Sequence, residues 1–401
     1  MSPRIALVCD YALDYLGGAQ TALLQEAAAL VGAGARVLLV APSSGSVPRH
    51  PEVTLVTVPA RWRLPGLDLP LVRHDGALRE RLRQTLETHG IEVVHLHSEL
   101  GLAAASVAAA GRAGLPVVHT VHTFFWQAPA PGQRLLAPLV RAYHRHVTGW
   151  RDGDGVRLAD RPADDALRRM TLTAARRADL VLSPSAHQAG RLRDAGLDPV
   201  AVLPNTVTAP DAPPLERVDA PLRVLWVGRC VPEKRILPFV RAAVLAQQRL
   251  GPGRLEVTVA GEGSQLEQAR GIAGGAVRFL GRRPHEEVPG LLADSHLLAL
   301  TSAGFDNQPM TVVEAVMARR PVLYCDEALT EGLAGPGILA PPTPEGLADA
   351  LVDLARDPGR VVSASRAAGA VREVFTPRRH AEDLLRLYRS LPGPLADRDG
   401  P

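Results

Sequence analysis

The chain's only lysine, Lys234, stands five residues after Arg229 in the segment LRVLWVGRCVPEKR. Arginine supplies the basic charge everywhere else, so a lysine at this place indicates a need for a compact ammonium rather than surface solvation. The apolar run that ends before Gly228 is typical of a buried strand, which places both cations on one loop at its carboxyl end. A planar guanidinium and a point charge on one loop suit a diphosphate, and they would stabilise negative charge on a leaving phosphate.

Two carboxylates stand eight residues apart in SAGFDNQPMTVVEAVMARR, with Asp306 in an expected loop and Glu314 on an expected helix. Glu314 would lie within about two turns of the helix N-terminus, where backbone N–H groups form an anion site. A capping aspartate and a glutamate favoured by the helix dipole would explain each residue alone, but not their place after the cationic loop. Carboxylates accept hydrogen bonds from sugar and ribose hydroxyls, so we predict a sugar and ribose site here. Its other expected members are Gly228, Asn307 as the helix cap, Gln308, Pro309 in the first turn, and Met310.

The first half of the chain offers a glycine pair and a strand-end histidine. Gly17 and Gly18 follow the first expected strand, where glycine lets the backbone approach a ligand and the next helix N-terminus attracts anions. A turn that simply requires glycine is the alternative. His122 falls at the carboxyl end of the expected strand 117–121, where ligand-binding residues lie. We therefore predict a site role for His122 and hydrogen-bonded structural roles for the other nearby histidines, His95, His97 and His119.

Apolar runs alternate with helical spacing along most of the chain. Strands are expected at 5–9, 36–41, 53–58, 92–96, 117–121, 179–182, 200–203, 222–227, 255–260, 277–280, 297–300 and 321–324. Helices are expected at 21–31, 78–88, 100–113, 238–249, 345–356 and 379–390. Such alternation predicts an α/β fold of Rossmann-like domains, each with a parallel sheet covered by helices on both faces.

A proline-rich segment divides this pattern in two. TAPDAPPLERVDAP, at 208–221, has four prolines and no periodicity, which is typical of a linker. It separates a domain at 1–207 from a second domain at 222–375, and a C-terminal helix and tail follow at 376–401. We expect the two domains to face each other across a cleft, with ligands beyond the carboxyl ends of the strands.

Composition excludes several classes of function. The net charge is only +3, which gives no signal for a nucleic-acid partner. No stretch approaches 18 consecutive apolar residues, and the N-terminus lacks the pattern of a signal peptide. The cysteines Cys9, Cys230 and Cys325 have no metal-ligand spacing and are expected to be reduced and buried. The sequence therefore predicts a cytoplasmic globular protein.

The motifs together resemble the retaining glycosyltransferases of family 4, also called group 1, which have the GT-B fold. In that family the signature acids contact the donor sugar and the ribose, and an Arg…Lys pair holds the diphosphate. The resemblance covers nearly the whole chain, but Asp306 replaces the usual glutamate, Thr206 a usual glycine, and TSAGFD a PS…E-type segment. The matching positions are Gly17-Gly18, His122, Pro204–Val207, Arg229 with Lys234, Gly261–Gly263, and Asp306 with Glu314.

The resemblance implies transfer of a sugar from a nucleoside-diphosphate sugar to an acceptor hydroxyl, with retention of anomeric configuration. The first domain would serve the acceptor and the second the donor, no metal or other cofactor would be required, and the C-terminal helix would cross back to the first domain. A nucleotide-sugar epimerase of the same fold and an inactive sugar-nucleotide-binding module are the alternatives.

The acceptor, a lipid or a glycan, is less well defined by the sequence. Phe124, Phe125 and Trp126 follow His122 closely, and the basic, apolar segment 134–150 is expected to be helical. These features suit either a lipid-acceptor lip with peripheral contact at the inner membrane face, or ordinary buried packing.

Overall fold

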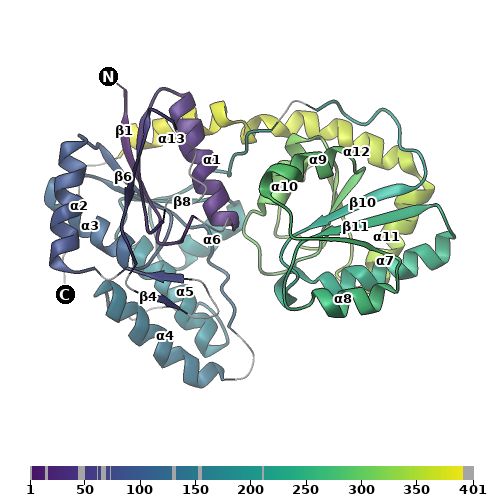
Figure 1. The fold of residues 1–401 in the computed structure, drawn as a ribbon, viewed down its shortest axis with the longest axis horizontal. Helices are drawn as coiled ribbons and strands as arrows, with labels where there is room; N and C mark the ends of the chain where they lie inside the picture. The colour runs from purple at the N-terminus through teal and green to yellow at the C-terminus, as the bar shows by residue number, and fades with distance from the viewer. Residues whose placement is uncertain are drawn as a thin grey trace. The chain divides into compact units, whose positions relative to one another are not determined.

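In the computed structural model, the described residues are 2–13, 17–43, 50–60, 62–64, 69–72, 74–128, 132–151, 156–209 and 212–391. They form two compact units (Figure 1), one of Met1–Thr206 with Pro377–Pro401 and one of Val207–Thr376. Each is an α/β domain with a parallel sheet, as the alternation of apolar runs and helices predicts.

The first unit has a seven-stranded parallel sheet in the order β3-β2-β1-β6-β7-β8-β9. Its strands are β1 (Arg4–Val8), β2 (Arg36–Ala41), β3 (Val53–Thr57), β6 (Val93–Leu96), β7 (Val117–Thr120), β8 (Leu180–Ser183) and β9 (Val200–Val202). A separate two-stranded ribbon joins β4 (Trp62–Leu64) to β5 (Leu69–Leu71). Its helices are α1 (Gly18–Gly32), α2 (Gly76–Thr88), α3 (Gly101–Ala113), α4 (Gln133–Thr148), α5 (Pro162–Ala175), α6 (Ala186–Asp194) and α13 (Pro377–Arg389).

Strand β1 shows why this sheet needs helices on both faces. Its apolar residues alternate between two cores: Ala6 and Val8 pack with α2 and α3, whereas Ile5 and Leu7 pack with α1 and α13. Successive side chains of a strand point to opposite faces, so a continuous apolar run must be covered twice.

The C-terminal helix α13 belongs to the first unit. Leu384, Leu385 and Tyr388 repeat on one face of α13 and enter the core formed by β1 and α1. The chain thus returns to its first domain, as the family resemblance implies. Residues 392–401, the rest of the predicted tail, lie outside the described residues.

The second unit has a six-stranded parallel sheet in the order β12-β11-β10-β13-β14-β15. Its strands are β10 (Leu222–Val227), β11 (Leu255–Ala260), β12 (Arg278–Gly281), β13 (Leu297–Leu300), β14 (Val322–Tyr324) and β15 (Gly337–Leu339). Its helices are α7 (Ile236–Leu250), α8 (Leu266–Ala273), α9 (Val288–Ala293), α10 (Met310–Met317), α11 (Pro344–Arg356) and α12 (Pro358–Val371), with 3-10 turns η1 (Pro232–Lys234), η2 (His285–Glu287) and η3 (Arg372–Phe375).

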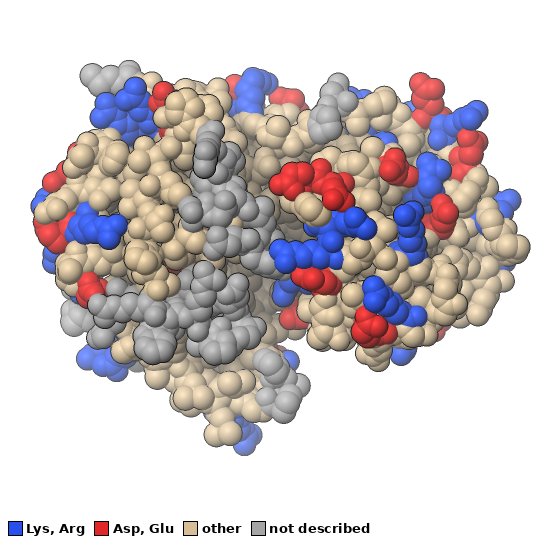
Figure 2. Space-filling model, viewed as in Figure 1, with Lys and Arg blue, Asp and Glu red and all other residues tan. Residues whose placement is uncertain are grey.

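The segment predicted as a linker packs on the second unit instead of standing apart. Leu215 and Val218 contact its hydrophobic core, and the Leu215 N–H donates to Ser365 Oγ at 2.8 Å. The apolar residues of this segment bury apolar surface against the second unit, which stabilises the contact. The number of prolines does not predict this packing. Figure 2 shows basic and acidic side chains interspersed on the visible face of this unit, which agrees with the small net charge.

Candidate functional site

The carboxyl ends of β10 and β13 form the predicted donor site of the second unit. These strands are neighbours, and the chain order reverses between them because β11 and β12 lie on one side and β14 and β15 on the other. Such a switch point opens a crevice beyond the strand ends, where ligands of doubly wound sheets bind. Fold topology therefore brings together the loop after β10 and the loop after β13.

Lys234 and Asp306 meet at this point. The Lys234 ammonium donates to Asp306 Oδ1, and the Ser302 hydroxyl donates to Oδ2 of the same carboxylate. Thr301 Oγ1 donates to the Lys234 carbonyl at 2.9 Å and accepts from Trp226 Nε1 at 3.0 Å, which ties the two loops together. The lysine and the first signature acid, 72 residues apart, thus form one charged pair.

Arg229 lies on the same loop but is exposed, and its guanidinium forms no ion pair with any residue in the described ranges. Close packing beside this loop depends on Gly261 and Gly263. A Cβ atom on Gly261 would stand 1.8 Å from the Gly228 carbonyl oxygen, and one on Gly263 would stand 2.5 Å from the Cys230 carbonyl oxygen. The Gly-x-Gly turn therefore lets the loops after β10 and β11 touch.

Glu314 is buried on α10, with 7% of its surface exposed, and no described residue donates a hydrogen bond to its carboxylate. Burial raises the pKa of Glu314 to about 7. His285 Nδ1 lies 3.6 Å from its Oε1, and burial lowers the pKa of His285. A buried carboxylate with a perturbed pKa at a switch point is typical of a ligand contact.

The predicted cap of α10 is wrong. The helix begins at Met310 with Pro309 as its N-cap, and no side chain caps it, so Asn307 does not perform that role. Asn307 and Gln308 are buried in the loop before the helix. Proline at the N-cap position holds the extended backbone that precedes the helix, which displaces the start beyond the reach of Asn307.

Sequence reasoning missed three polar side chains at this end of the sheet. Ser302 and Thr301 bond the Lys234–Asp306 pair, and His285 faces Glu314. Thr301 and Ser302 directly follow β13, and His285 lies shortly after β12. Their position at carboxyl ends was the available signal.

In the first unit, the glycine pair lies at the start of α1. Gly17 is the N-cap in an extended conformation (φ −96°), and Gly18 is exposed, with no described residue outside its own helix backbone and chain neighbours within 4 Å of where a Cβ would stand. Neither glycine has a positive φ, so the turn itself does not require glycine. Open space beside a helix N-terminus favours the close-approach interpretation.

His122 follows β7 and pairs with His97, which follows β6. Their facing atoms, His122 Nε2 and His97 Nδ1, are 2.8 Å apart, and the rings stack with centroids 5.1 Å apart. Burial first, and then the neighbouring His97, hold the pKa of His122 well below its usual range. His95 bonds Thr120 Oγ1 at 2.7 Å, in line with its predicted structural role. His119 is buried, but its Nδ1 has no hydrogen-bond partner among the described residues, so the predicted hydrogen bonding is not observed for that atom. His97, by contrast, contacts the predicted site histidine directly.

The aromatic residues after His122 do not form an exposed lip. Phe124 is buried in a core with α5 and α6, Phe125 stacks on His187 with centroids 5.4 Å apart, and Trp126 Nε1 donates to Thr171 Oγ1 at 3.3 Å. Packing against α5 and α6 thus buries Phe124, while Phe125 and Trp126 are half-buried.

Helix α4 does expose apolar residues. Leu135 is 76% exposed and Leu139 is 64% exposed, one turn apart. Arg134 and Arg145 are exposed on the same helix, while Ala137 and His144 on the opposite side are buried. Within the described part of the chain, no helix has the length and apolar character needed to cross a membrane.

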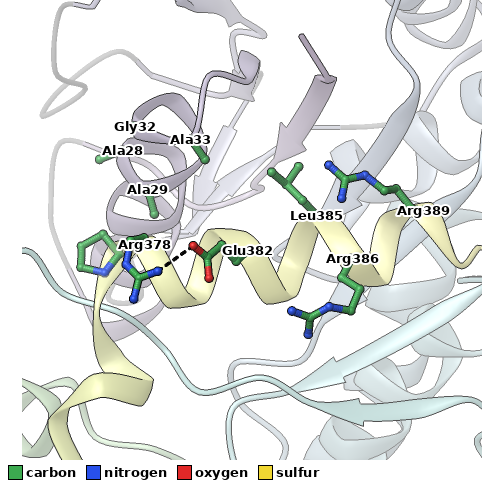
Figure 3. A pocket seen from close by; sticks show the side chains of 10 residues that line it. Ala28, Ala29, Gly32, Ala33, Arg378, Glu382, Leu385, Arg386 and Arg389 are labelled. Atoms are coloured by element: carbon green, nitrogen blue, oxygen red, sulfur yellow. Dashed lines mark hydrogen bonds and ion pairs between the residues drawn. The ribbon is translucent and has the colours of Figure 1, made fainter. Parts of the chain in front are cut away.

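A groove between α1 and α13 lies apart from the predicted residues. Figure 3 shows its lining, which includes Ala29 of α1, Ala33 just after that helix, and Leu385 and Arg389 of α13. None of the predicted site residues contributes to it. The predicted site is therefore defined by the strand ends and not by this groove.

Comparison with known proteins identifies a glycosyltransferase family in each half of the chain. Residues 16–209 match the family described as Glycosyltransferase Family 4, and residues 221–357 match Glycosyl transferases group 1. A phosphatidyl-myo-inositol mannosyltransferase of Mycolicibacterium smegmatis is 25% identical over 370 residues, covering 88% of this chain and 85% of that protein. The protein of the same name from Mycobacterium leprae is 26% identical over 372 residues, 88% of each.

Solved structures establish the fold class. HepE from Anabaena in complex with UDP superposes with a TM-score of 0.64 at 18% identity, covering 97% of this chain and 100% of that one. Sucrose-phosphate synthase from Thermosynechococcus elongatus gives a TM-score of 0.68 at 18% identity, covering 97% and 99%. Both halves of the chain match glycosyltransferase families and its two Rossmann-like domains match GT-B structures, so this protein belongs to the group 1, family 4 glycosyltransferases.

Proposed function

We propose that this glycosyltransferase moves a hexose from a nucleoside-diphosphate sugar to a hydroxyl of a membrane-lipid headgroup, with retention of anomeric configuration. The observation that carries the proposal is the Lys234–Asp306 pair at the switch point that also holds the Glu314 helix. One cation and two buried carboxylates beyond adjacent strand ends suit a ligand with a diphosphate at its centre and hydroxyl groups at either end.

In this assignment, Lys234 and Arg229 hold the diphosphate, with the amides at the start of α10 as further donors. Asp306 accepts from the sugar hydroxyls and Glu314 from the ribose. Gly228, Asn307, Gln308, Pro309 and Met310 shape the donor pocket of the second unit, and Gly17, Gly18 and His122 are assigned to the acceptor side in the first unit.

The reaction breaks the bond between the sugar C1 and the β-phosphate oxygen and forms a bond from C1 to the acceptor oxygen on the same face. The acceptor proton passes to the departing β-phosphate oxygen, so the proposal needs no separate strong base. Lys234 would stabilise the charge that develops on that phosphate. Protein cations hold the diphosphate, and the proposal assigns no metal to this step.

The relatives support the two substrates. HepE is known in complex with UDP and with UDP-glucose, which supports a nucleotide-sugar donor. The mycobacterial relatives are named for transfer of mannose to phosphatidyl-myo-inositol, which supports a lipid acceptor. The exposed Leu135 and Leu139 with neighbouring arginines on α4 suit peripheral contact with anionic lipid, on the cytoplasmic side of a membrane.

A screen of UDP- and GDP-hexoses, first alone and then with phosphatidylinositol vesicles, tests the proposal. Without acceptor, we expect slow hydrolysis of the donor to the free sugar. With acceptor, we expect a radiolabelled glycolipid, and NMR should show that its anomeric configuration is the same as that of the donor. A new epimer of the donor without acceptor would instead establish the epimerase. Donor binding without turnover on any acceptor would establish the inactive module.

A further inference from the structure

A cluster of two histidines, one glutamate and one tyrosine lies buried in the first unit, between α1, β6 and α13. Glu26 comes from α1, His95 from β6, His97 from just after it, and Tyr388 from α13. Glu26 is 4% exposed, His95 0% and His97 2%. A carboxylate removed from water in this way needs a compensating positive charge.

Three ligand atoms converge within the cluster. Glu26 Oε1 lies 3.0 Å from His95 Nδ1 and 3.2 Å from His97 Nε2, and all three atoms lie within 4.8 Å of one another. Glu26 Oε1 and His97 Nε2 nevertheless have no hydrogen-bond partner among the described residues. Donor atoms bound to one tetrahedral zinc ion at about 2.0–2.2 Å stand about 3.3–3.5 Å apart. The two distances from Glu26 to the imidazoles are thus a few tenths of an ångström shorter than the spacing around a bound ion.

The outer nitrogens of both imidazoles are held by other groups. His95 Nε2 lies 2.7 Å from Thr120 Oγ1, and His97 Nδ1 lies 2.8 Å from His122 Nε2. Metal-binding histidines typically use the second ring nitrogen in this way, which fixes the tautomer and the ring orientation. The arrangement leaves the inner nitrogens directed at Glu26.

The second carboxylate oxygen of Glu26 has a partner on α13. His380 Nε2 lies 3.2 Å from Oε2, the carboxylate oxygen that does not face the two ring nitrogens.

We propose that Glu26, His95 and His97 bind a divalent transition-metal ion, most suitably Zn²⁺, at a closed structural site. Two imidazoles and one carboxylate are ligands that Zn²⁺ accepts in tetrahedral sites. The Tyr388 hydroxyl, 2.7 Å from His95 Nδ1, is the nearest further donor for the fourth position.

Such an ion would join three elements that are far apart in the sequence. It would link α1 to the end of β6 and, through Tyr388, to α13 at the end of the chain. It would also fix His97 and thereby the orientation of His122. The site belongs to the first unit and takes no part in the diphosphate chemistry proposed for the second.

Metal analysis of the full-length protein tests this site directly. The protein is stripped with a chelator, reloaded with Zn²⁺ or Co²⁺ and freed of excess metal before mass-spectrometric quantification. We expect about one equivalent per chain, a tetrahedral Co²⁺ absorption band without thiolate charge transfer, and a higher Tm with Zn²⁺. Less than about a tenth of an equivalent of bound metal, with an unchanged Tm, would overturn the proposal. Hydrogen bonds alone would then hold the cluster together.

Ligand variants locate the ion. Loss of an outer-shell partner alone weakens metal binding about 10- to 100-fold, so Glu26→Gln and His97→Gln should weaken it by about 100-fold or more. His144→Gln is the matched control, because His144 is another buried histidine of this unit that bonds the Glu99 carbonyl and not the cluster. Full metal content in both ligand variants would overturn the assignment. The wild-type stoichiometry decides the question even if a variant fails to fold.

Discussion

At the scale of single residues, Lys234 has two roles that conflict in the ligand-free protein. It pairs with Asp306, yet the proposed chemistry requires its charge at the leaving phosphate. We expect Lys234→Ala to lower the transfer rate about 100- to 1,000-fold, since loss of one such group typically costs about 2.7–4 kcal/mol of transition-state stabilisation. Lys234→Arg should also be slow, because a planar fork does not replace the compact ammonium.

The pair with Asp306 complicates Lys234→Ala, because removing the cation leaves a buried carboxylate without its partner. The double variant Lys234→Ala with Asp306→Asn controls for that effect. Steady-state kinetics should show the double variant as slow as Lys234→Ala, while its Tm recovers. Near wild-type rates in folded Lys234→Ala would refute the diphosphate assignment.

Glu314 predicts a pH dependence of donor binding. Its raised pKa of about 7 means that the free protein holds a neutral acid below that pH and a carboxylate above it. Only the carboxylate accepts hydrogen bonds from both ribose hydroxyls, so donor affinity should rise about tenfold between pH 6 and pH 8. Calorimetric titration with an intact nucleotide sugar measures this change. Glu314→Gln should bind the donor more weakly at pH 8, and its donor affinity should not change with pH. If donor affinity in this variant still rises with pH, another group titrates.

At the scale of elements, the start of α1 separates a structural glycine from a functional one. Gly18 is helical, its φ is not positive, and a Cβ there would have no described residue beyond its own helix backbone and chain neighbours within 4 Å. Gly18→Ala should therefore leave the Tm unchanged or slightly higher, since alanine is the better helix former. If a ligand approaches this backbone, kcat/KM should still fall at least about tenfold. Unchanged kinetics would show that Gly18 takes no part in the site.

Gly261 is the contrasting position, because a Cβ there would collide with the Gly228 carbonyl. Gly261→Ala should lower both the Tm and the activity. The two variants together distinguish a glycine that leaves room for a ligand from one that leaves room for another loop.

Helix α4 predicts membrane binding at the same scale. Replacing exposed Leu135 and Leu139 with serine removes apolar surface without disturbing the buried side of the helix. Cosedimentation with anionic vesicles should fall several-fold, and binding of the wild type should weaken as salt rises. Leu339→Ser, which changes another exposed leucine in the second unit, is the control and should bind like the wild type. Equal cosedimentation of all variants would exclude α4 as the contact.

At the scale of the whole molecule, the chain order and the folding units do not coincide. Helix α13 comes last in the chain but supplies Leu384 to the core of the first unit. Leu384 is fully buried, so Leu384→Ala should destabilise that unit by about 2–5 kcal/mol. Calorimetry should show a lower Tm for the unfolding of the first unit. The transition whose Tm rises with nucleotide should keep its wild-type Tm, because we assign it to the second unit. If Leu384→Ala lowers the nucleotide-dependent transition instead, the donor site belongs to the first unit.

The sequence alone determined the alternation of strands and helices, because apolar runs of strand length and helical spacing are local patterns. β2, β10, β11 and β13 begin and end where the apolar runs predict. Lys234, Asp306 and Glu314 also stood out locally, by residue type and by position after strands. Matches to glycosyltransferase families over both halves then confirmed the family resemblance.

Tertiary structure alone decided which of these groups meet. The Lys234–Asp306 pair and the contact of His97 with His122 depend on strand order, which local patterns do not specify. The packing of 212–221 and the burial of Phe124 depended on neighbours distant in sequence, whereas Pro309, a local residue, set the start of α10. Glu26 gave no signal within its own helix, since its partners come from β6 and α13. Side-chain chemistry is local, but burial and contact are set by the topology of the sheet, and these are what turn a polar residue into part of a site.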